Sequence, residues 1–373
     1  MKEIIIIGAG AIGRGFLPWI FGNGLYDLVF VDSNKELIDK MRSRKKYSAY
    51  RAKNKKLEEM TVNIKDALLS SEFLIAKYPD AAAVFMCVGP RNAVAAAAGL
   101  KGARCPVILC ENEPQTVPAV RGAIGGDNVY FAVPDVITSN TASPQILAKD
   151  PLSIITEDGI ILVDDRAKGI KGNITFCSED ELINKHWTAK LYLHNTPHCI
   201  TAYLGALVGA RYIHESMSYP DINKIVAGSM NEMLSSLKLK WDIPHQFLDW
   251  YAEKELKRFS NDLLYDPISR VAREPLRKLE LEGRLIGAAQ ICVSLGFIPH
   301  NILKGITSAI LFEDENDTDH HLSFMRKVLP PQVLLTHILG LRKGEALEMI
   351  MRERLPKIIS QLEELIRENK ARK

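Results

Sequence analysis

The segment "IIIIGAGAIGRGF" (4–16) constrains the fold of this 373-residue chain more than any other. Its run of isoleucines predicts a strand buried on both faces, and the residues after the glycines have helical spacing. Gly8, Gly10 and Gly13 form a G-x-G-x-x-G pattern between the two. The first glycine permits a tight turn, the second lets a ligand approach the backbone, and the third lets the helix pack closely on the strand. We therefore expect a ligand-binding turn in a parallel α/β sheet.

A turn of this kind binds the pyrophosphate of a dinucleotide, because exposed N–H groups and the positive end of the helix dipole favour phosphate. We expect Ala11 and Ile12 to take part with the three glycines. Asp32 ends the next apolar run, and a carboxylate there accepts hydrogen bonds from ribose hydroxyls. Since it would repel a 2′-phosphate, NAD is the expected cofactor, although Arg14 offers a phosphate contact. The alternative is a core of this fold that binds no dinucleotide.

Two kinds of hydrophobic pattern divide the chain. Short apolar runs alternate with helical patterns in the first half, which predicts parallel strands at 4–8, 28–32, 83–89, 107–112 and 129–135. From about residue 180, helical spacing dominates at 198–214, 221–239, 244–259, 284–296 and 344–369. We expect an α/β Rossmann-type domain with a parallel sheet at 1–180, followed by an all-α domain at 181–373.

One stretch of the first half departs from this parallel pattern. "LSIITEDGIILVDD" (152–165) contains two apolar runs of strand length on either side of Asp158 and Gly159. An Asp-Gly pair between two such runs is typical of a tight hairpin turn. We therefore expect an antiparallel extension at the edge of the parallel sheet.

The composition excludes several classes of protein. The formal net charge of +3 is too small to indicate a nucleic-acid footprint, and we interpret the basic run "RSRKKYSAYRAKNKK" (42–56) as a solvated connection. The six cysteines are scattered without the spacing of a zinc site. No apolar run approaches the ~18–20 residues of a membrane helix. We expect a cytoplasmic protein that binds no metal, no nucleic acid and no membrane.

A glycine and two polar residues follow the later strands. "CVGP" (87–90) places Gly89 at the carboxyl end of one strand, where ligands of open α/β sheets bind. "CEN" (110–112) ends the next strand and directs Glu111 and Asn112 towards the same crevice. We expect Gly89 and Asn112 to contact the cofactor. The alternatives are an ordinary strand-to-helix turn at Gly89 and a helix cap at Asn112.

The stretch "KLYLHNTPHC" (190–199) gathers an ammonium, a carboxamide and an imidazole in Lys190, Asn195 and His198. Hydride transfer at a secondary alcohol needs a base for the hydroxyl proton and donors for the developing oxyanion. A buried lysine can be that base, because burial lowers the pKa of an ammonium towards neutrality. Thr196 and Pro197 predict the start of a helix. By spacing alone, the three side chains could equally be a surface lysine, a helix cap and a structural histidine.

The pattern Lys-x4-Asn-x2-His, followed by "ITAYLG" (200–205), resembles the signature of the polyol-specific long-chain dehydrogenases. The likeness extends over nearly the whole chain through "GAGAIGRGF" (8–16), "VGP" (88–90), "CEN" (110–112), "RVAREPLRKL" (270–279), "GRLIGAA" (283–289) and "PHNILKGI" (299–306). It implies NAD-linked, metal-independent oxidation of a polyol, in particular a polyol phosphate such as mannitol 1-phosphate, to a ketose or ketose phosphate. It also implies a monomer.

The resemblance assigns roles to four residues. By it, Lys190 is the general base, Asn112 and Asn195 stabilise the oxyanion, and His198 binds substrate hydroxyls. Pro197 departs from the family, which often has a small residue there. The arginine of a family Asp-Arg-Ile stretch is replaced by Val136 after Asp135, and no carboxylate shortly precedes Lys190. These departures put the substrate in question more than the chemistry.

A basic cluster in the helical half offers a site for a substrate phosphate. Arg273 and Arg277 stand close in sequence to Arg270 and Lys278, and we expect the two to bind the phosphate. Arginines at such spacing also pair with acidic neighbours or face solvent. His300 matches the family and is expected in the substrate pocket, with a core or capping role as the alternative.

Two other functions remain open at this point. One is a β-hydroxyacid dehydrogenase of the 6-phosphogluconate type, which also joins a Rossmann domain to a helical one. Its lysine and asparagine usually lie one helical turn apart, unlike the five-residue step from Lys190 to Asn195. The other is a non-enzymatic protein that senses a dinucleotide, because fold alone does not establish catalysis.

Overall fold

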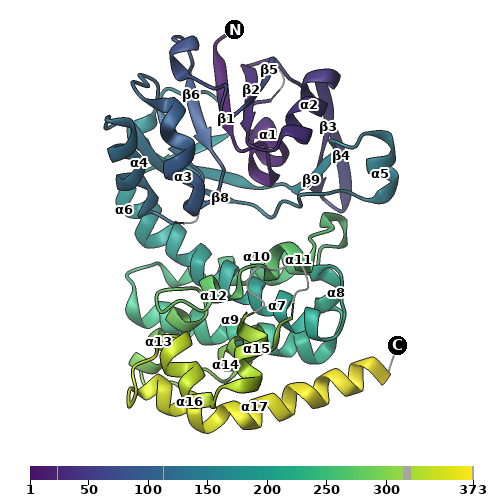
Figure 1. The fold of residues 1–373 in the computed structure, drawn as a ribbon, viewed down its shortest axis with the longest axis vertical. Coiled ribbons are helices and arrows are strands. Elements are labelled where there is room, and N and C mark those ends of the chain that lie inside the picture. Colours follow the sequence, from purple (N-terminus) through teal and green to yellow (C-terminus); the bar gives the residue numbers. More distant parts are fainter. Residues whose placement is uncertain (23, 112, 314–320, 372–373) are drawn as a thin grey trace. The chain divides into compact units, whose positions relative to one another are not determined.

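The computed structural model describes the chain except for residues 23, 112, 314–320 and 372–373 (Figure 1). It divides into two compact units. Unit 1 is Met1–Trp187 with Leu263–Tyr265, and unit 2 is Thr188–Asp262 with Asp266–Lys373. The boundary expected after residue 180 lies within the short helix α6 (Glu179–Glu181), shortly before the chain leaves unit 1.

Unit 1 contains an eight-stranded sheet in the order β11-β10-β8-β7-β6-β1-β2-β5 (Figure 1). The strands are β1 (Glu3–Ile7), β2 (Asp27–Asp32), β5 (Asp66–Leu69), β6 (Ala83–Met86), β7 (Val107–Leu109), β8 (Val129–Asp135), β10 (Ile160–Asp164) and β11 (Ile174–Cys177). From β5 to β8 every neighbouring pair is parallel, whereas β10 runs antiparallel to β8. The predicted fold class, a parallel sheet with an antiparallel extension, is confirmed.

The isoleucine run explains why β1 occupies the middle of this sheet. Ile4 and Ile6 belong to one hydrophobic cluster, and Ile5 and Ile7 belong to the other. Successive strand residues point to opposite faces, so a run without polar residues suits only a strand covered on both sides. Helices η1 (Ala11–Phe16) and α1 (Leu17–Phe21) contribute to the first cluster, and α3 (Pro90–Ala96) and α4 (Thr116–Ile124) contribute to the second.

A second, three-stranded sheet has the order β4-β3-β9, with β3 (Lys46–Lys53), β4 (Lys56–Asn63) and β9 (Ile154–Glu157). The prediction that 42–56 is a solvated connection is therefore wrong. Tyr47 and Ala49 are buried, whereas Lys46 is exposed and Ser48 and Tyr50 are partly exposed; Ala52 further along β3 is buried as well. This alternation with period two is a strand signal that the charge of the segment obscured. Asn54 and Lys55, both with positive φ, form the tight turn of the hairpin.

The predicted hairpin at Asp158 and Gly159 is also wrong. β9 pairs parallel with β3 in the small sheet, and β10 pairs antiparallel with β8 in the large one. The Asp-Gly pair thus carries the chain from one sheet to the other. Asp158 forms ion pairs with Arg51 (3.1 Å) and Lys53 (2.9 Å) on β3, which stabilise the connection on that side.

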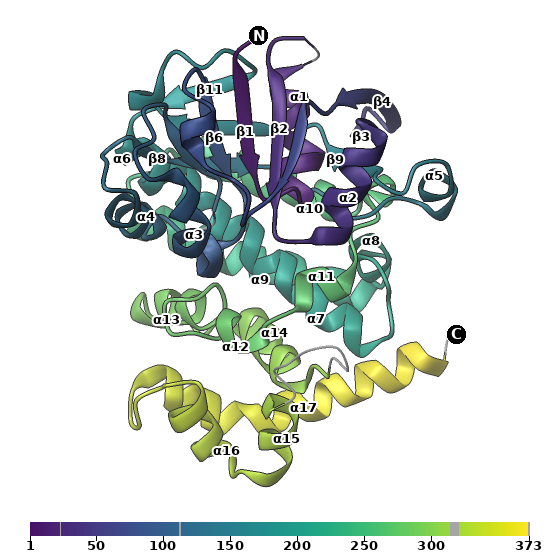
Figure 2. The same cartoon turned by 45° about the horizontal axis from the view of Figure 1, so that its top comes forward.

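Unit 2 is helical, as predicted (Figures 1 and 2). Its main helices are α7 (Thr196–Leu207), α8 (Ile213–Met217), α9 (Pro220–Lys240), α10 (His245–Phe259), α11 (Ile268–Ala272), α12 (Pro275–Lys278), α13 (Ile286–Ser294), α14 (His300–Leu311), α15 (His321–Val328) and α17 (Ala346–Ala371). α7 is buried from Thr196 to Gly205 and packs against α8, α9, α11 and α14. A helix that is apolar on all sides is typical of a core position. None of the helices in the described part of the chain is both long and apolar enough to cross a bilayer.

α7 begins at Thr196, as predicted, but Thr196 is not its N-cap residue. The backbone is already helical at Asn195 (φ −64°, ψ −35°), and the π-helix η6 (Lys190–Asn195) leads directly into α7. An N-cap residue requires a non-helical backbone, so Thr196 cannot cap. Its hydroxyl instead donates to the Leu191 carbonyl at 3.1 Å and to the Arg284 carbonyl at 2.6 Å. His198 consequently lies in the first turn of α7, which η6 extends towards the N-terminus.

Candidate active site

The glycine turn has the geometry that a dinucleotide requires. Gly8 has φ +97°, and a Cβ there would lie 2.5 Å from the Cys87 carbonyl oxygen. A Cβ on Gly13 would collide with the Gly8 carbonyl oxygen and lie 2.8 Å from Ile6, so the helix can approach β1 only without a side chain. Gly10, by contrast, faces open space. The turn is thus closed on the protein side and open where a phosphate would approach the backbone.

Ala11 and Ile12, predicted to line the same turn, are partly exposed at the start of η1. Asp32 stands at the end of β2 beside them. Its carboxylate accepts hydrogen bonds from the backbone N–H of Ala9 (2.8 Å) and of Asn34 (2.8 Å), one on each oxygen. An ionised carboxylate has about four acceptor positions, so both oxygens keep a lone pair for a ribose hydroxyl. These residues fit a dinucleotide whose ribose carries free hydroxyls.

Arg14 does not offer the phosphate contact considered from the sequence. Its side chain is 8% exposed, and it donates to the backbone carbonyls of Ala9 (3.3 Å) and Leu152. The Tyr47 hydroxyl donates to the Arg14 carbonyl at 2.6 Å. Burial lowers the pKa of Arg14 from its usual value. The guanidinium stabilises the glycine turn through its hydrogen bond to Ala9.

At the carboxyl ends of β6 and β7, Gly89 and Glu111 lie close together. Gly89 has φ +85°, faces open space and precedes α3. Glu111 is buried and turns back to accept a hydrogen bond from the Val88 N–H at 2.9 Å. Asn112, predicted to bind cofactor and oxyanion, lies outside the described residues, so its roles stay predictions.

The Lys190 and Asn195 side chains are brought onto one face by an unusual helical turn. In an α-helix of 3.6 residues per turn, residues five apart point in different directions. η6 is a π-helix, whose i→i+5 hydrogen bonds place residues five apart one turn apart. Asn195 and His198, three apart, are then neighbours at the start of α7. All three side chains are at most 7% exposed. In sequence, the five-residue step from Lys190 to Asn195 indicates a difference from the β-hydroxyacid dehydrogenases. Because the π-helix makes this step one turn, the spacing does not distinguish the two families.

His198 is held by a buried acid that the sequence analysis did not single out. Its Nε2 donates to Asp266 Oδ2 at 3.0 Å, and Arg270 donates to Oδ1 of the same carboxylate at 3.0 Å from Nε and 2.5 Å from a terminal nitrogen. Burial by itself would raise the pKa of Asp266, but Arg270 and His198 hold it below its usual value. Because the carboxylate accepts this hydrogen bond, Nε2 of His198 carries a proton. In the neutral imidazole, Nδ1 is then the hydrogen-bond acceptor. Phe259 stacks on the His198 ring at 5.2 Å between centroids.

A second buried histidine and acid adjoin this arrangement. His194 Nδ1 donates to Glu255 Oε2 at 2.5 Å, and Glu255, fully buried on α10, also accepts from Arg258. The His194 and His198 rings lie 5.0 Å apart. The two histidine–carboxylate hydrogen bonds therefore form one buried layer. No local sequence pattern links residues so distant along the chain, so this layer is visible only in the folded protein.

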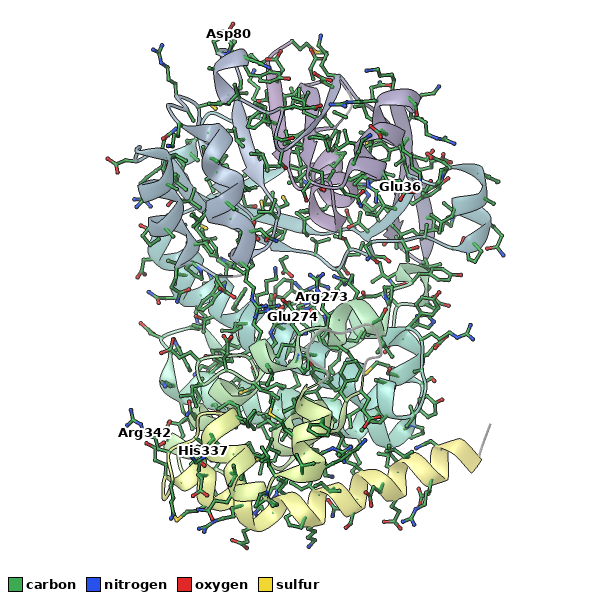
Figure 3. All side chains as sticks on the ribbon, viewed as in Figure 1. Glu36, Asp80, Arg273, Glu274, His337 and Arg342 are labelled. Carbon is green, nitrogen blue, oxygen red and sulfur yellow. The ribbon has the colours of Figure 1, made fainter. Side chains whose placement is uncertain are left out.

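The residues of the basic cluster have different environments. Figure 3 labels Arg273 of this cluster and the adjoining Glu274. Arg273 is exposed, while Arg277 donates to Glu274 at 3.1 Å and Arg270 serves Asp266. Lys278 is 3% exposed, and its ammonium contacts the Arg273 carbonyl and lies 5.7 Å from the centroid of the Tyr203 ring on α7. Burial lowers the pKa of Lys278 to about 7, an effect to which Arg284 adds. Sequence charge marked this lysine, but only the fold shows that it is buried.

His300, predicted in the substrate pocket, is exposed at the first residue of α14 and lies 3.3 Å from the Arg354 guanidinium on α17. Its substrate role stays a prediction.

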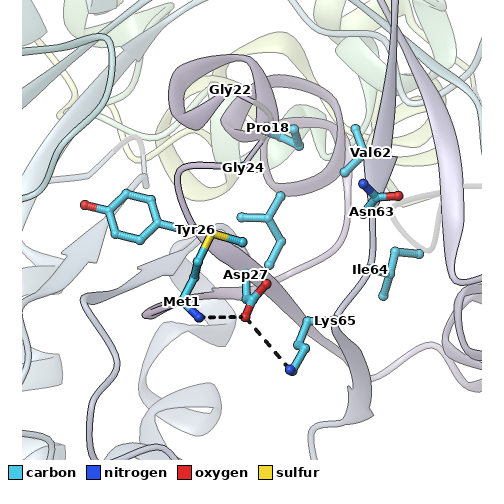
Figure 4. Close-up of a pocket in the computed structure, with 11 residues that line it drawn as sticks. Met1, Pro18, Gly22, Gly24, Tyr26, Asp27, Val62, Asn63, Ile64 and Lys65 are labelled. Carbon is cyan, nitrogen blue, oxygen red and sulfur yellow. Dashed lines mark ion pairs between the residues drawn. The ribbon is translucent and has the colours of Figure 1, made fainter.

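The hollow drawn in Figure 4 is lined by Met1, Tyr26, Asp27, Asn63 and Lys65 among others, at the amino ends of β1 and β2. The glycine turn lies at the carboxyl ends of these strands. The hollow therefore does not belong to the predicted dinucleotide site.

Comparisons with known proteins identify the family of the two units. The mannitol dehydrogenase Rossmann domain profile matches residues 2–157, and the mannitol dehydrogenase C-terminal domain profile matches residues 183–324. A mannitol-1-phosphate 5-dehydrogenase of Caldanaerobacter subterraneus is 32% identical over 340 residues, which cover 85% of this chain and 88% of that protein. The enzyme of the same name from Clostridium acetobutylicum is 30% identical over 332 residues, covering 83% and 86%.

Solved structures share the fold. Pseudomonas fluorescens mannitol 2-dehydrogenase, in a ternary complex with NAD and D-mannitol, superposes with a TM-score of 0.74 at 18% identity, over 98% of this chain and 94% of its own. A D-sorbitol dehydrogenase superposes with a TM-score of 0.63 at 18% identity, over 84% and 81%. The NAD in the first of these agrees with the cofactor expected from Asp32. The predicted family and enzyme class are confirmed: the chain belongs to the mannitol dehydrogenase family.

Proposed function

We propose that this chain is an NAD-dependent oxidoreductase that interconverts a polyol phosphate, such as mannitol 1-phosphate, and the corresponding ketose phosphate. The relatives named mannitol-1-phosphate 5-dehydrogenase, at about 30% identity over most of both chains, support the phosphorylated substrate. The single observation that carries the chemistry is the buried face shared by Lys190, Asn195 and His198. The oxidoreductase class is common to the family, whereas the substrate and the residue roles are our proposal.

In this proposal Lys190 removes the proton from the substrate hydroxyl. NAD, held by the glycine turn and Asp32, would supply the hydride acceptor. Burial favours the neutral amine that a base needs. The Asn195 carboxamide donates to the oxygen as charge develops on it. His198, fixed by Asp266, accepts a hydrogen bond from a second hydroxyl of the substrate. In the reverse direction the protonated lysine returns the proton to the alkoxide. No metal ion takes part in these steps.

We assign phosphate binding to Arg273. Its guanidinium is exposed, and in the described part of the chain it is not engaged in an ion pair, whereas Arg277 already binds Glu274. The unusual backbone at Glu274 (φ +55°) turns the chain between α11 and α12 at this point. An arginine binds phosphate through two parallel hydrogen bonds, which gives both affinity and orientation.

The test is NADH oxidation at 340 nm by the purified protein, with fructose 6-phosphate, fructose and a panel of other ketoses, ketose phosphates and keto acids. We expect oxidation with a ketose phosphate. Activity with the unphosphorylated ketose alone would keep the chemistry and refute the phosphate site. Activity with keto acids alone would favour the β-hydroxyacid alternative, and NADH binding without any turnover would favour a sensor.

Substitution of Lys190 tests the base. Lys190→Ala should lower turnover by a factor on the order of 10² to 10⁴ and leave NADH affinity unchanged. Lys185→Ala is the matched control, because Lys185 lies on the same helical segment and pairs with Glu181 at 2.7 Å. Near-normal turnover of Lys190→Ala would exclude Lys190 as the base.

A further inference from the structure

Glu111 is a buried acid that the proposed chemistry does not use. It follows β7 and is 4% exposed. Its Oε1 accepts a hydrogen bond from the Val88 N–H at 2.9 Å, and the carboxyl group also accepts from the backbone N–H of Gly89. One side chain therefore holds both N–H groups of the turn that joins β6 to α3.

That turn lies where the nicotinamide half of the cofactor must pass. Strand order reverses direction at β1 and β6, and ligands of such sheets bind across the crevice at this point. Asp32, on the β2 side, takes the ribose of one nucleotide, and the glycine turn takes the pyrophosphate. The other nucleotide then lies over the carboxyl ends of β6 and β7. None of the residues that the structure describes occupies the space where a Cβ of Gly89 would lie, so the second nucleotide can approach the Gly89 backbone closely.

The surroundings of Glu111 make its charge sensitive to small changes. Burial raises the pKa of Glu111 to about 7, the two backbone N–H groups oppose this rise, and the negative charge of Glu113 adds to it. The Cys87 thiol interacts with Glu111 and with Cys110, and burial raises the pKa of Cys87 well above its usual value. Glu111 therefore changes its charge near neutral pH.

We propose that Glu111 is a positioning residue for the dinucleotide: its ionised carboxylate holds the Val88–Gly89 turn in the shape that receives the nicotinamide half, so that cofactor binding is linked to the loss of one proton. An ionised carboxylate has acceptor positions for both N–H groups. A protonated one carries an O–H that must turn away from them, which weakens the support of the turn. This inference rests on the dinucleotide site proposed above and not on the polyol chemistry.

The experiment is calorimetric titration of the full-length chain with NADH, without substrate, from pH 6 to pH 8.5. The wild-type Kd should fall about three- to tenfold as pH rises, and never more than tenfold per pH unit, because one proton is involved. Glu111→Gln keeps the size of the side chain and one acceptor oxygen but cannot ionise. Its Kd should stay constant over this range, near the wild-type value at pH 6. Glu36→Gln, which removes an exposed carboxylate on α2 (Lys35–Arg44), should behave as the wild type.

A second measurement needs no variant. Wild-type NADH titrations at pH 7, in two buffers of different ionisation enthalpy, count the protons exchanged on binding. We expect release of roughly half a proton, the share of Glu111 that is protonated at that pH. The absence of proton release would overturn the proposal, as would a wild-type pH dependence that persists in Glu111→Gln. Failure of the wild-type chain to bind NADH at any pH would overturn the dinucleotide site itself.

Discussion

Replacement of Lys278 by methionine should stabilise this protein, and the gain should depend on pH in a defined way. Lys278 is buried against α7, and its native pKa of about 7 lies below the ~10.5 of an unfolded lysine. Between these values the native state binds fewer protons than the unfolded state. The free energy of unfolding therefore rises with pH across this window, and the penalty of burying the amine is largest below pH 7.

The magnitude follows from the two pKa values. At pH 7 the penalty is about 4 kcal/mol, and at pH 9 it has fallen to about 2 kcal/mol. Methionine has a similar length and no charge, so Lys278→Met removes the penalty. It also leaves the Arg273 carbonyl without its ammonium donor, which costs about 1–3 kcal/mol. The expected net gain is about 1–3 kcal/mol at pH 7 and about 2 kcal/mol less at pH 9.

The assay is urea unfolding at pH 7, 8 and 9, followed by tryptophan fluorescence, since Trp241 and Trp250 lie in unit 2. Lys257→Met is the matched control, because the side chain of Lys257 is 74% exposed. The change in the free energy of unfolding that this substitution causes should be the same at pH 7, 8 and 9. A difference between Lys278→Met and the wild type that is the same at pH 7 and pH 9 would refute the reasoning. It would mean that the amine is not desolvated in the native protein.

Three further outcomes are expected. Gly13→Ala should abolish NADH binding or folding, because its Cβ would collide with the Gly8 carbonyl oxygen, and a variant with wild-type Kd in calorimetry would contradict this packing. Asp266→Asn should lower kcat/KM about 10- to 100-fold, mainly through KM, since His198 and Arg270 lose a charged partner worth about 1.5–3 kcal/mol, and unchanged kinetics would remove Asp266 from the site. Arg273→Ala should raise KM about tenfold or more for a ketose phosphate but not for the free ketose, and an equal effect on both would exclude phosphate binding.

Much of the fold was predictable because local sequence patterns determine it. The isoleucines of β1 and the glycines after it require a buried strand and a turn that only glycine can form, whatever the rest of the chain does. The change from strand-length apolar runs to helical spacing separates the sheet from the helices in the same way. The Lys-Asn-His pattern was recognisable by its resemblance to a known family. In each case a short segment carries the whole signal.

Other features depended on partners that the local pattern does not specify. The sequence "TEDGI" has the composition of a hairpin turn, but the strands on either side pair with β3 and β8 and not with each other. Thr196 does not cap α7, because η6 continues the helix before it. The Thr196 hydroxyl instead contacts the Leu191 and Arg284 carbonyls.

The sequence by itself thus determined the type of fold and the glycine turn, and it supplied the side chains that we propose as reactive. Only the tertiary structure decided that Asp266, 68 residues from His198, orients this histidine, and that Lys278 is buried. The physical reason is that backbone geometry and hydrophobic period act over a few residues. Burial and charge pairing, in contrast, are properties of the whole packed unit, and they set the pKa values and orientations on which the chemistry depends.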